Sequence, residues 1–239
     1  MECNGWLQEQ AEKLGILLSR EALERLAHYG RLLQEWNKTV NLTTITDLPE
    51  IYELHFLDSL SVVLSADMAQ VESLIDVGTG AGFPGLVLAI AFPEMQVVLL
   101  DSIKKKTRFL QTVVNELGLE KQVRIICERA EVVGQDPHFR EQYDLAVARA
   151  VARLATLAEY CLPLVRVGGC FVAQKGPEMA GELEEANSGL ALLGGAHGRT
   201  WGWVLPSGAA RTLVRVDKCS PTPSKYPRRP GLPHKRPLS

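Results

Sequence analysis

Three features of the sequence predict an α/β fold with a doubly wound sheet and a helical N-terminal segment. From Val71 on, short β-rich runs alternate with helical stretches, which is typical of a parallel sheet with crossover helices. A glycine-rich turn follows the first of these runs and precedes a helical stretch. Before Val71, apolar residues recur near helical spacing. At 239 residues the chain suits one good-sized core rather than two.

The N-terminal segment is expected to be helical up to about residue 68. A break near residues 37–49 is followed by a shorter amphipathic run, which predicts a helix over 49–64. Asp47 is placed to cap this helix, and Pro49 suits its first turn. The run before the break is carried by Leu14, Leu17, Leu18, Leu23, Leu26, Leu32, Leu33 and Trp36.

Seven strands are predicted after this segment, and helices fill the connections between them. The most clearly defined of these helices are expected over residues 104–117 and 153–164. The predicted strands cover residues 73–77, 96–100, 123–127, 143–148, 169–174, 200–205 and 212–218.

Three regions are therefore expected: a helical segment over 1–68, an α/β domain over 69–220 and a tail over 221–239. The tail has six prolines in 19 residues, so we expect it to be extended, either packed on the domain or awaiting a partner. The formal net charge is −2, but residues 218–239 hold six Lys or Arg and no acid, which leaves −8 on the remainder. Basic charge is thus concentrated at the C-terminal end.

Several classes of protein are disfavoured by composition and spacing. The five cysteines show no CxxC or Cys/His ligand spacing, so neither a metal nor a disulfide role is expected. The N-terminus has no signal-peptide pattern, and the apolar stretch 83–100 is interrupted by two prolines and a glutamate. We expect a cytoplasmic protein without a membrane span. No Ser-His-Asp or HExxH arrangement is visible, and His28 and His55 lack catalytic partners at recognisable spacing.

A glycine-rich loop containing Gly78, Gly80 and Gly82 is the clearest candidate site. Its glycines let the backbone approach a ligand at the carboxyl end of the sheet. The loop also fits the dinucleotide pattern G-x-G-x-x-G, with Asp101 at the distance of a ribose-binding acid. Asp76 favours S-adenosylmethionine instead, because a carboxylate beside the loop suits an ammonium group and would repel a pyrophosphate. The alternative is that Asp76 only caps a turn.

Further candidate residues follow the next strands. Asp101 ends the second predicted strand, where its carboxylate can accept two ribose hydroxyls. Arg129, Ala130 and Glu131 follow the third strand, where such folds hold an adenine. Arg149 ends the fourth strand, at the edge that faces the ligand crevice. Exposure on the surface is the alternative for Arg129.

Motifs outside the loop extend over the whole chain. They comprise Asn41-Leu42-Thr43, His55-Phe56-Leu57-Asp58-Ser59-Leu60, Ala148-Arg149-Ala150-Val151-Ala152, Gln174-Lys175-Gly176 and Lys225-Tyr226-Pro227-Arg228-Arg229. Together with the loop that runs from Asp76 to Gly85, they resemble the RsmG family, also called glucose-inhibited division protein B. The Gly- and Ala-rich stretch 179–198 is the least family-like part, and no role is assigned to it.

The resemblance implies a Rossmann-like class I methyltransferase domain over 69–220 that methylates N7 of a guanine in the 530 loop of 16S rRNA. It implies S-adenosylmethionine as the methyl donor, S-adenosylhomocysteine as the product, and no metal. The family pattern places the donor against Gly78, Phe83, Ala130, Glu131 and Arg149. The expected partner is 16S rRNA within the small subunit or an assembly precursor, and the expected state is a monomer.

Guanine N7 carries a lone pair and no proton, so the reaction needs no general base. Arg129 and Arg149 are the candidates for positioning the base or its phosphate, because one guanidinium can donate two hydrogen bonds to a guanine edge or to a phosphate. The basic tail could simply be a solvated terminus. Because it contains no acidic residues, contact with RNA phosphates is favoured. The RNA-binding candidates are Lys175, Lys218, Lys225, Arg228, Arg229, Lys235 and Arg236.

Three other functions share parts of these patterns. A small-molecule or protein methyltransferase would use the same fold, because fold does not fix the substrate. A nicotinamide oxidoreductase would share the glycine loop, although Asp76 argues against it. A non-catalytic ribosome-associated module would retain the loop without using it. The intact loop glycines and Asp101 disfavour this third function.

Overall fold

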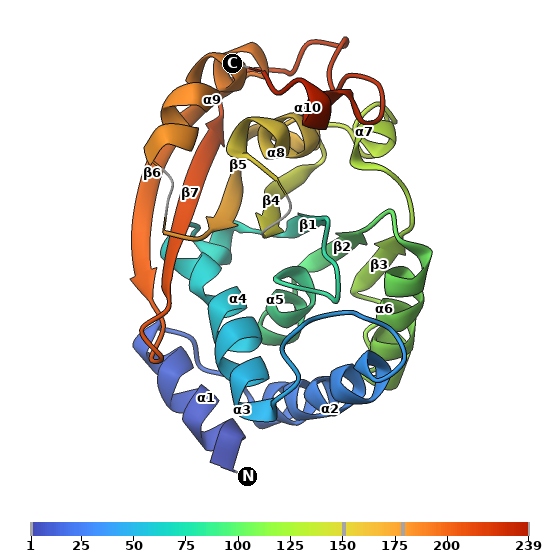
Figure 1. Ribbon diagram of the computed structural model, residues 1–239, viewed down its shortest axis with the longest axis vertical. Helices are drawn as coiled ribbons and strands as arrows, with labels where there is room; N and C mark the ends of the chain where they lie inside the picture. The colour runs from blue at the N-terminus through green and yellow to red at the C-terminus, as the bar shows by residue number, and fades with distance from the viewer. Residues whose placement is uncertain (1, 150–151, 178–179, 239) are drawn as a thin grey trace.

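A seven-stranded sheet with the order β3-β2-β1-β4-β5-β7-β6 forms the centre of the molecule (Figure 1). The computed structural model describes residues 2–149, 152–177 and 180–238. β1 to β5 are parallel, whereas β7 pairs antiparallel with both β5 and β6. The strands are β1 (Ser73–Val77), β2 (Gln96–Leu100), β3 (Val123–Ile126), β4 (Tyr143–Arg149), β5 (Val165–Lys175), β6 (Gly195–Val204) and β7 (Ala210–Lys218).

The predicted α/β class and the seven strands are confirmed, with differences of a few residues at the strand ends. β5 is longer than expected and begins at Val165. Its pairing with β4 shifts register between the pairs Tyr143–Val165 and Leu145–Cys170. β6 and β7 form a hairpin whose short connection contains Gly208 at φ 88°. Antiparallel strands can be joined by such a turn, whereas parallel strands need a crossover.

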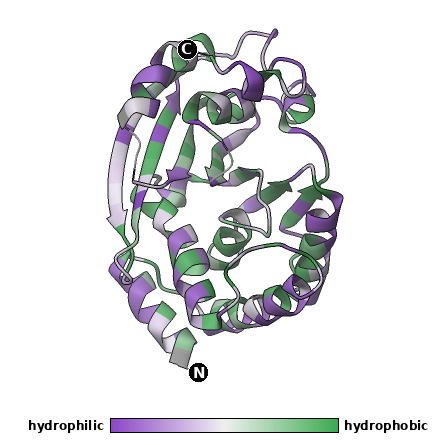
Figure 2. Cartoon of the chain, viewed as in Figure 1, coloured by the Kyte–Doolittle hydropathy of each residue, from purple (hydrophilic) through white to green (hydrophobic). Residues whose placement is uncertain are grey.

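Alternate side chains of the central strands enter two hydrophobic clusters, one on each face of the sheet. Leu74 belongs to one cluster and Ile75 to the other, and Leu145 and Ala146 divide in the same way. This is the period of two expected for a strand buried on both faces. Figure 2 shows the same distribution, with hydrophobic colour along the central strands and a neutral to hydrophilic edge at β6.

Helices cover both faces of the sheet. The cluster containing Leu74 also holds side chains of α5 (Gly85–Ala91) and α6 (Lys104–Glu116). The opposite cluster holds side chains of α8 (Leu154–Cys161) and α9 (Ala180–Leu192). α9 occupies most of the stretch that had no assigned role, and it packs against α8 through Ala186 and Leu190. Its glycines and alanines obscure the amphipathic pattern in the sequence.

The predicted helical N-terminal segment is confirmed, and it shares its core with the sheet. α1 (Glu2–Lys13) and α2 (Arg20–Asn37) contribute to the same hydrophobic cluster as α5 and α6. Asp47 occupies the N-cap position of the next helix and Pro49 its first turn, as expected, but the Asp47 side chain makes no capping hydrogen bond. The following helical run is α3 (Leu48–Ile51), the π-helix η1 (Tyr52–Leu57), α4 (Asp58–Leu60) and the 3₁₀-helices η2 (Ser61–Leu64) and η3 (Met68–Gln70).

The C-terminal tail packs on the domain beside the short helix α7 (Ala130–Val133), forms the short helix α10 (Leu232–Lys235) and ends at α9, where Leu238 lies against Gly189 (Figure 1). Arg140 donates hydrogen bonds to the tail carbonyls of Thr222 and Tyr226 at 2.7 and 2.8 Å. Arg228 forms an ion pair of 2.6 Å with Glu159, whose side chain is fully buried. These contacts hold the tail on the domain, and the Arg228 ion pair neutralises a buried carboxylate.

Within the described ranges, no helix combines the length and the hydropathy needed to cross a membrane.

Replacement of Arg228 by Met should destabilise the protein by about 2 to 4 kcal/mol, because the buried carboxylate of Glu159 would lose its charged partner. Urea denaturation measures the free energy of unfolding. Arg229→Met is the matched control, since Arg229 is exposed. Equal losses in the two variants would contradict a structural role for the Arg228 ion pair.

Candidate functional site

A cavity of about 680 Å³ lies at the carboxyl ends of β1, β2 and β4. Val77, Leu100 and Arg149 line it from the ends of these strands. The loop after β1 and the start of α7 supply further walls. This is the position at which open α/β sheets bind ligands, and the volume suits a ligand of nucleotide size.

The glycine-rich loop adopts a shape that its glycines permit. Gly78, Gly80 and Gly82 have φ values of 75°, 64° and 104°, which side-chain-bearing residues rarely adopt. Gly78 and Gly80 line the cavity, and a Cβ on Gly80 would meet no heavy atom closer than 3.9 Å. Gly82 instead lies against Tyr29, whose hydroxyl would be 2.6 Å from an added Cβ and donates to the carbonyl of Ala81.

Asp76 lies beneath the loop rather than among the residues that line the cavity. Its Oδ2 accepts hydrogen bonds of 2.7 Å from the Thr79 hydroxyl and from the backbone N–H of Gly85. Burial raises the pKa of Asp76 to about 6, although these two hydrogen bonds act in the opposite direction. Oδ2 therefore holds the loop from below, whereas the buried Oδ1 has no hydrogen-bond partner among the described residues, and the role of Asp76 toward the donor stays a prediction.

Asp101 reaches the cavity from the end of β2. One carboxylate oxygen accepts the N–H of Gly80 at 2.9 Å, and the other accepts the N–H of Ile103 at 2.8 Å. Lys106 lies 3.9 Å from the carboxylate and also lines the cavity. A carboxylate oxygen has lone pairs beyond one hydrogen bond, so Asp101 retains acceptor capacity for ligand hydroxyls.

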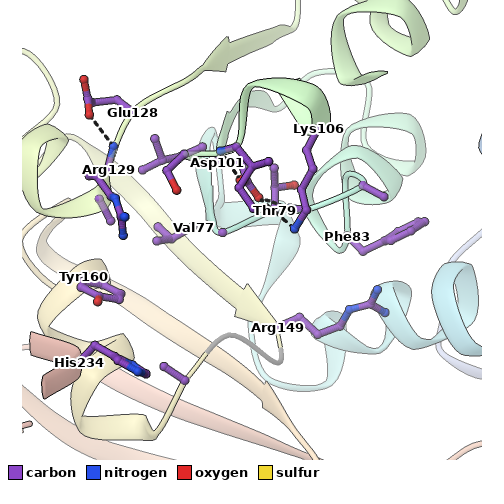
Figure 3. A pocket seen from close by; sticks show the side chains of 18 of the residues that line it. Val77, Thr79, Phe83, Asp101, Lys106, Glu128, Arg129, Arg149, Tyr160 and His234 are labelled. Atoms are coloured by element: carbon purple, nitrogen blue, oxygen red, sulfur yellow. Dashed lines mark hydrogen bonds and ion pairs between the residues drawn. The ribbon is translucent and has the colours of Figure 1, made fainter. Parts of the chain in front are cut away.

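Arg129, Ala130 and Glu131 line the cavity at the start of α7. Figure 3 shows Arg129 on the same side of the cavity as Tyr160 and His234, away from Lys106. Glu131 is 3% exposed and accepts the N–H of Gly231 at 2.8 Å. This carboxylate therefore also ties the tail to the wall of the cavity.

Arg149 is held by a network of protein acceptors. One terminal nitrogen lies 3.2 Å from the Leu54 carbonyl and 3.2 Å from Asp58 Oδ2, and the other lies 3.2 Å from His55 Nδ1. The guanidinium also stacks 4.9 Å from the centre of the Phe83 ring. Burial lowers the pKa of Arg149, but Asp58 and Asp76 oppose that effect. The described residues engage three of its five N–H donors.

His55 is the main cavity residue that sequence reasoning missed. It stacks on Phe83 with ring centres 4.3 Å apart, and its Nε2 lies 2.9 Å from the Thr43 hydroxyl. Burial, reinforced by Arg149, lowers the pKa of His55 to about 3, so the ring is neutral at physiological pH. His55 lies in the π-helix η1, and such turns are frequent at functional sites. Only the family motif drew attention to His55 and Thr43.

The basic candidates for RNA contact divide into two groups. Lys175 pairs with Glu182 at 2.9 Å and Arg228 pairs with Glu159, so both charges are used within the fold. Lys218 is fully buried and donates to the Leu162 carbonyl, so its predicted contact with RNA is wrong. The exposed group consists of Lys225, Arg229, Lys235 and Arg236.

Lys235 and His234 also line the cavity, and Lys235 thus joins the exposed basic surface to the site. Ala150 and Val151, from one of the family-like motifs, lie outside the described residues. Ala152, at the end of that motif, lines the cavity.

Solved structures of similar shape include methyltransferases. An O-methyltransferase from Bacillus cereus in complex with SAH has a TM-score of 0.58 and 15% identity, covering 80% of this chain and 91% of that chain. A SAM-dependent O-methyltransferase from Thermotoga maritima has a TM-score of 0.53 and 16% identity, covering 70% and 66%. The fold is that of the Rossmann-like, S-adenosylmethionine-dependent methyltransferases.

Sequence comparison narrows this class to one family. The chain belongs to the GidB family, described as rRNA small subunit methyltransferase G, whose model matches residues 22–201. A ribosomal RNA small subunit methyltransferase G of Alkaliphilus metalliredigens is 44% identical over 239 residues, all of both chains. The enzyme of that name from Leuconostoc citreum is 47% identical over 227 residues, 94% of this chain and 95% of its own. The resemblance found in the motifs is confirmed.

The neutral, buried state of His55 predicts a pH-dependent stability. As the pH falls below about 6.5, the unfolded chain binds a proton at His55 that the folded chain excludes until about pH 3. The free energy of unfolding should therefore fall by up to about 1.4 kcal/mol per pH unit from this group. Urea denaturation between pH 7 and 5 should show a weaker pH dependence for His55→Gln than for the wild type.

His197→Gln provides the control for the pH experiment, because His197 is an exposed histidine on the edge strand β6. This variant should retain the pH dependence of the wild type. Parallel pH profiles for the wild type and His55→Gln would show that His55 is protonated equally in the folded and unfolded states.

Proposed function

We propose that this protein transfers a methyl group from S-adenosylmethionine to N7 of a guanine in the 530 loop of 16S rRNA. The observation that carries the proposal is the full-length similarity to rRNA small subunit methyltransferase G, combined with a glycine-lined cavity at the ends of the central strands. The expected substrate is the small ribosomal subunit or an assembly precursor, met in the cytoplasm by a monomer.

The residues of the cavity fit the proposed donor. Gly78 and Gly80 line the cavity without side chains, and no heavy atom lies closer than 3.9 Å to the Cβ position of Gly80. Asp101 would offer acceptors to ribose hydroxyls, and Ala130 and Glu131, which also line the cavity, would hold the adenine. S-adenosylmethionine would supply a methyl group on a positively charged sulfur, and the carboxylates of Asp101, Glu128 and Glu131 are among the charged groups that line the cavity.

The chemistry requires alignment rather than proton transfer. A bond forms from the N7 lone pair to the methyl carbon while the bond from that carbon to sulfur breaks, and the positive charge passes to the purine. The protein must therefore hold the base in line and exclude water. Arg149 is fixed by three protein acceptors, so its remaining donors are preorganised, whereas Arg129 is exposed and free to follow a phosphate.

The exposed basic residues of the tail are proposed to hold the RNA backbone. Lys225, Arg229 and Arg236 lie on the surface of the docked tail, and Lys235 stands at the cavity wall. Together these residues would bind a phosphate backbone on the surface and at the entrance to the cavity. A base within folded RNA must leave its stack to enter such a site.

The decisive experiment is transfer of radiolabelled methyl from S-adenosylmethionine to small subunits from cells that lack this protein. We expect label on N7 of a single guanine in the 530 loop, and loss of that label in an Asp101→Ala variant. Calorimetry should show weakened donor binding by that variant. Tight donor binding by the wild type without any label on RNA would favour a methyltransferase with a different substrate.

Simultaneous replacement of Lys225, Arg229 and Arg236 by Ala should weaken binding to small-subunit RNA while leaving donor affinity unchanged. The slope of log K against log salt should decrease by about 2 to 3, because three phosphate contacts would be lost. Filter binding across a salt series measures this slope. The control changes the same charge on the N-terminal helices by replacing Lys13, Arg20 and Lys38, which are also exposed. An equal effect of both triple variants would contradict a local RNA contact at the tail.

A further inference from the structure

A chain of hydrogen bonds runs from the end of β4 to the loop between α2 and α3. It begins at the Arg149 guanidinium, passes through the His55 ring and ends at the Thr43 hydroxyl, with separations of 3.2 and 2.9 Å. All three residues line the cavity. Thr43 belongs to the N-terminal segment, so this wall of the cavity lies outside the sheet and its glycine loop.

The loop that carries Thr43 is anchored at its base by one side chain. Asn37 accepts the backbone N–H groups of Leu42 and Thr43 at 2.8 and 3.0 Å, and donates to the Thr43 carbonyl at 2.8 Å. Figure 1 shows this loop arching from the end of α2 back to α3. Thr43 is therefore a fixed point of the cavity wall, because its backbone is held on both sides.

The partners of His55 determine the direction of the chain. A guanidinium only donates, so Arg149 requires a lone pair on His55 Nδ1. The Leu54 carbonyl lies 3.1 Å from Nδ1, but Nδ1 cannot donate to this carbonyl while it accepts from the guanidinium of Arg149. The proton of the neutral ring then lies on Nε2, and Nε2 donates to the Thr43 hydroxyl oxygen.

The hydroxyl of Thr43 is thereby left as a donor. Its oxygen accepts from His55 Nε2 and also from the backbone N–H of Ile45 at 3.1 Å. A hydroxyl has two lone pairs and one hydrogen, and both lone pairs are now used. The hydrogen finds no acceptor among the described residues, and Thr43 is partly exposed to the cavity.

We propose that the Thr43 hydroxyl donates a hydrogen bond to O6 of the target base and so selects guanine over adenine. The inference rests on the proposed function. Guanine presents an acceptor at position 6 beside N7, whereas adenine presents an N–H₂ donor there. A hydroxyl with only its hydrogen available would pair with guanine and oppose adenine, and Arg149 enforces that state through His55.

O6 is the acceptor required, because a hydrogen bond to N7 would occupy the lone pair that attacks the methyl group. A donor at O6 leaves this lone pair free and fixes the edge of the base that carries it. Thr43 is thus a specificity-determining residue rather than an acid or base in the reaction.

The test is a cycle of two changes, one in the enzyme and one in the RNA. Thr43→Val removes the hydroxyl with little change of shape, and 2-aminopurine at the target position removes O6 while keeping N7. We expect kcat/KM on guanine to fall about 10-fold with Thr43→Val, the size of one neutral hydrogen bond, and to show no further Thr43 effect on 2-aminopurine. Differences in the intrinsic reactivity of the two purines cancel in this comparison.

Two further variants exclude a merely structural effect. Thr43→Ser keeps the hydroxyl and should retain activity on guanine close to that of the wild type. Thr44→Val makes the same change at the next, exposed position and should not discriminate between the two bases. Donor affinity measured by calorimetry should be the same in all of them.

Nitrogen NMR of the His55 ring checks the direction of the chain without any methyl transfer. A proton on Nε2 supports a donor hydroxyl at Thr43, and a proton on Nδ1 overturns the inference. Equal losses from Thr43→Val on guanine and 2-aminopurine would overturn it while leaving the proposed function intact. A wild-type enzyme that binds its donor but methylates no guanine would overturn the proposed function and, with it, this inference.

Discussion

The burial of the Arg149 guanidinium is the constraint on which the arrangement of the site depends. A buried charge must be paired and hydrogen-bonded, since leaving it alone would cost several kcal/mol. Asp58 supplies the charge, and its Oδ2 also lies 3.3 Å from Arg211 Nε. Because Asp58 belongs to the N-terminal helices and Arg211 to β7, one carboxylate joins three parts of the chain at the cavity.

The two sides of the cavity are built from different parts of the molecule. Strand ends and the glycine loop form one side, which any fold of this class provides. The N-terminal helices and their loop form the other, and they bring His55 and Thr43 to it. His55 and Thr43 thus meet Arg149, at the end of β4, from outside the sheet.

The basic residues of the C-terminal end fall into two groups, one paired with carboxylates inside the fold and one exposed to water. Lys218 and Arg228 neutralise Glu141 and Glu159 inside the fold, and burial lowers the pKa of Lys218. Their neighbours Lys225 and Arg229 remain in water. Composition cannot separate these two groups, because a lysine in an ion pair and a lysine at a surface have the same sequence signature.

The sequence by itself determined the strands, the glycine loop and the position of Asp101 at the end of β2. These features depend on local hydrophobic periodicity and on backbone conformations that few residues permit. It also determined the family, through motifs spread over the chain. Only the tertiary structure decided that Asp76 supports the loop from beneath, that Lys218 is buried, and that Thr43, His55 and Arg149 form one chain. Those facts depend on contacts between residues up to about a hundred positions apart, such as Arg149 with Leu54, and no local pattern encodes which distant partner a polar side chain will meet.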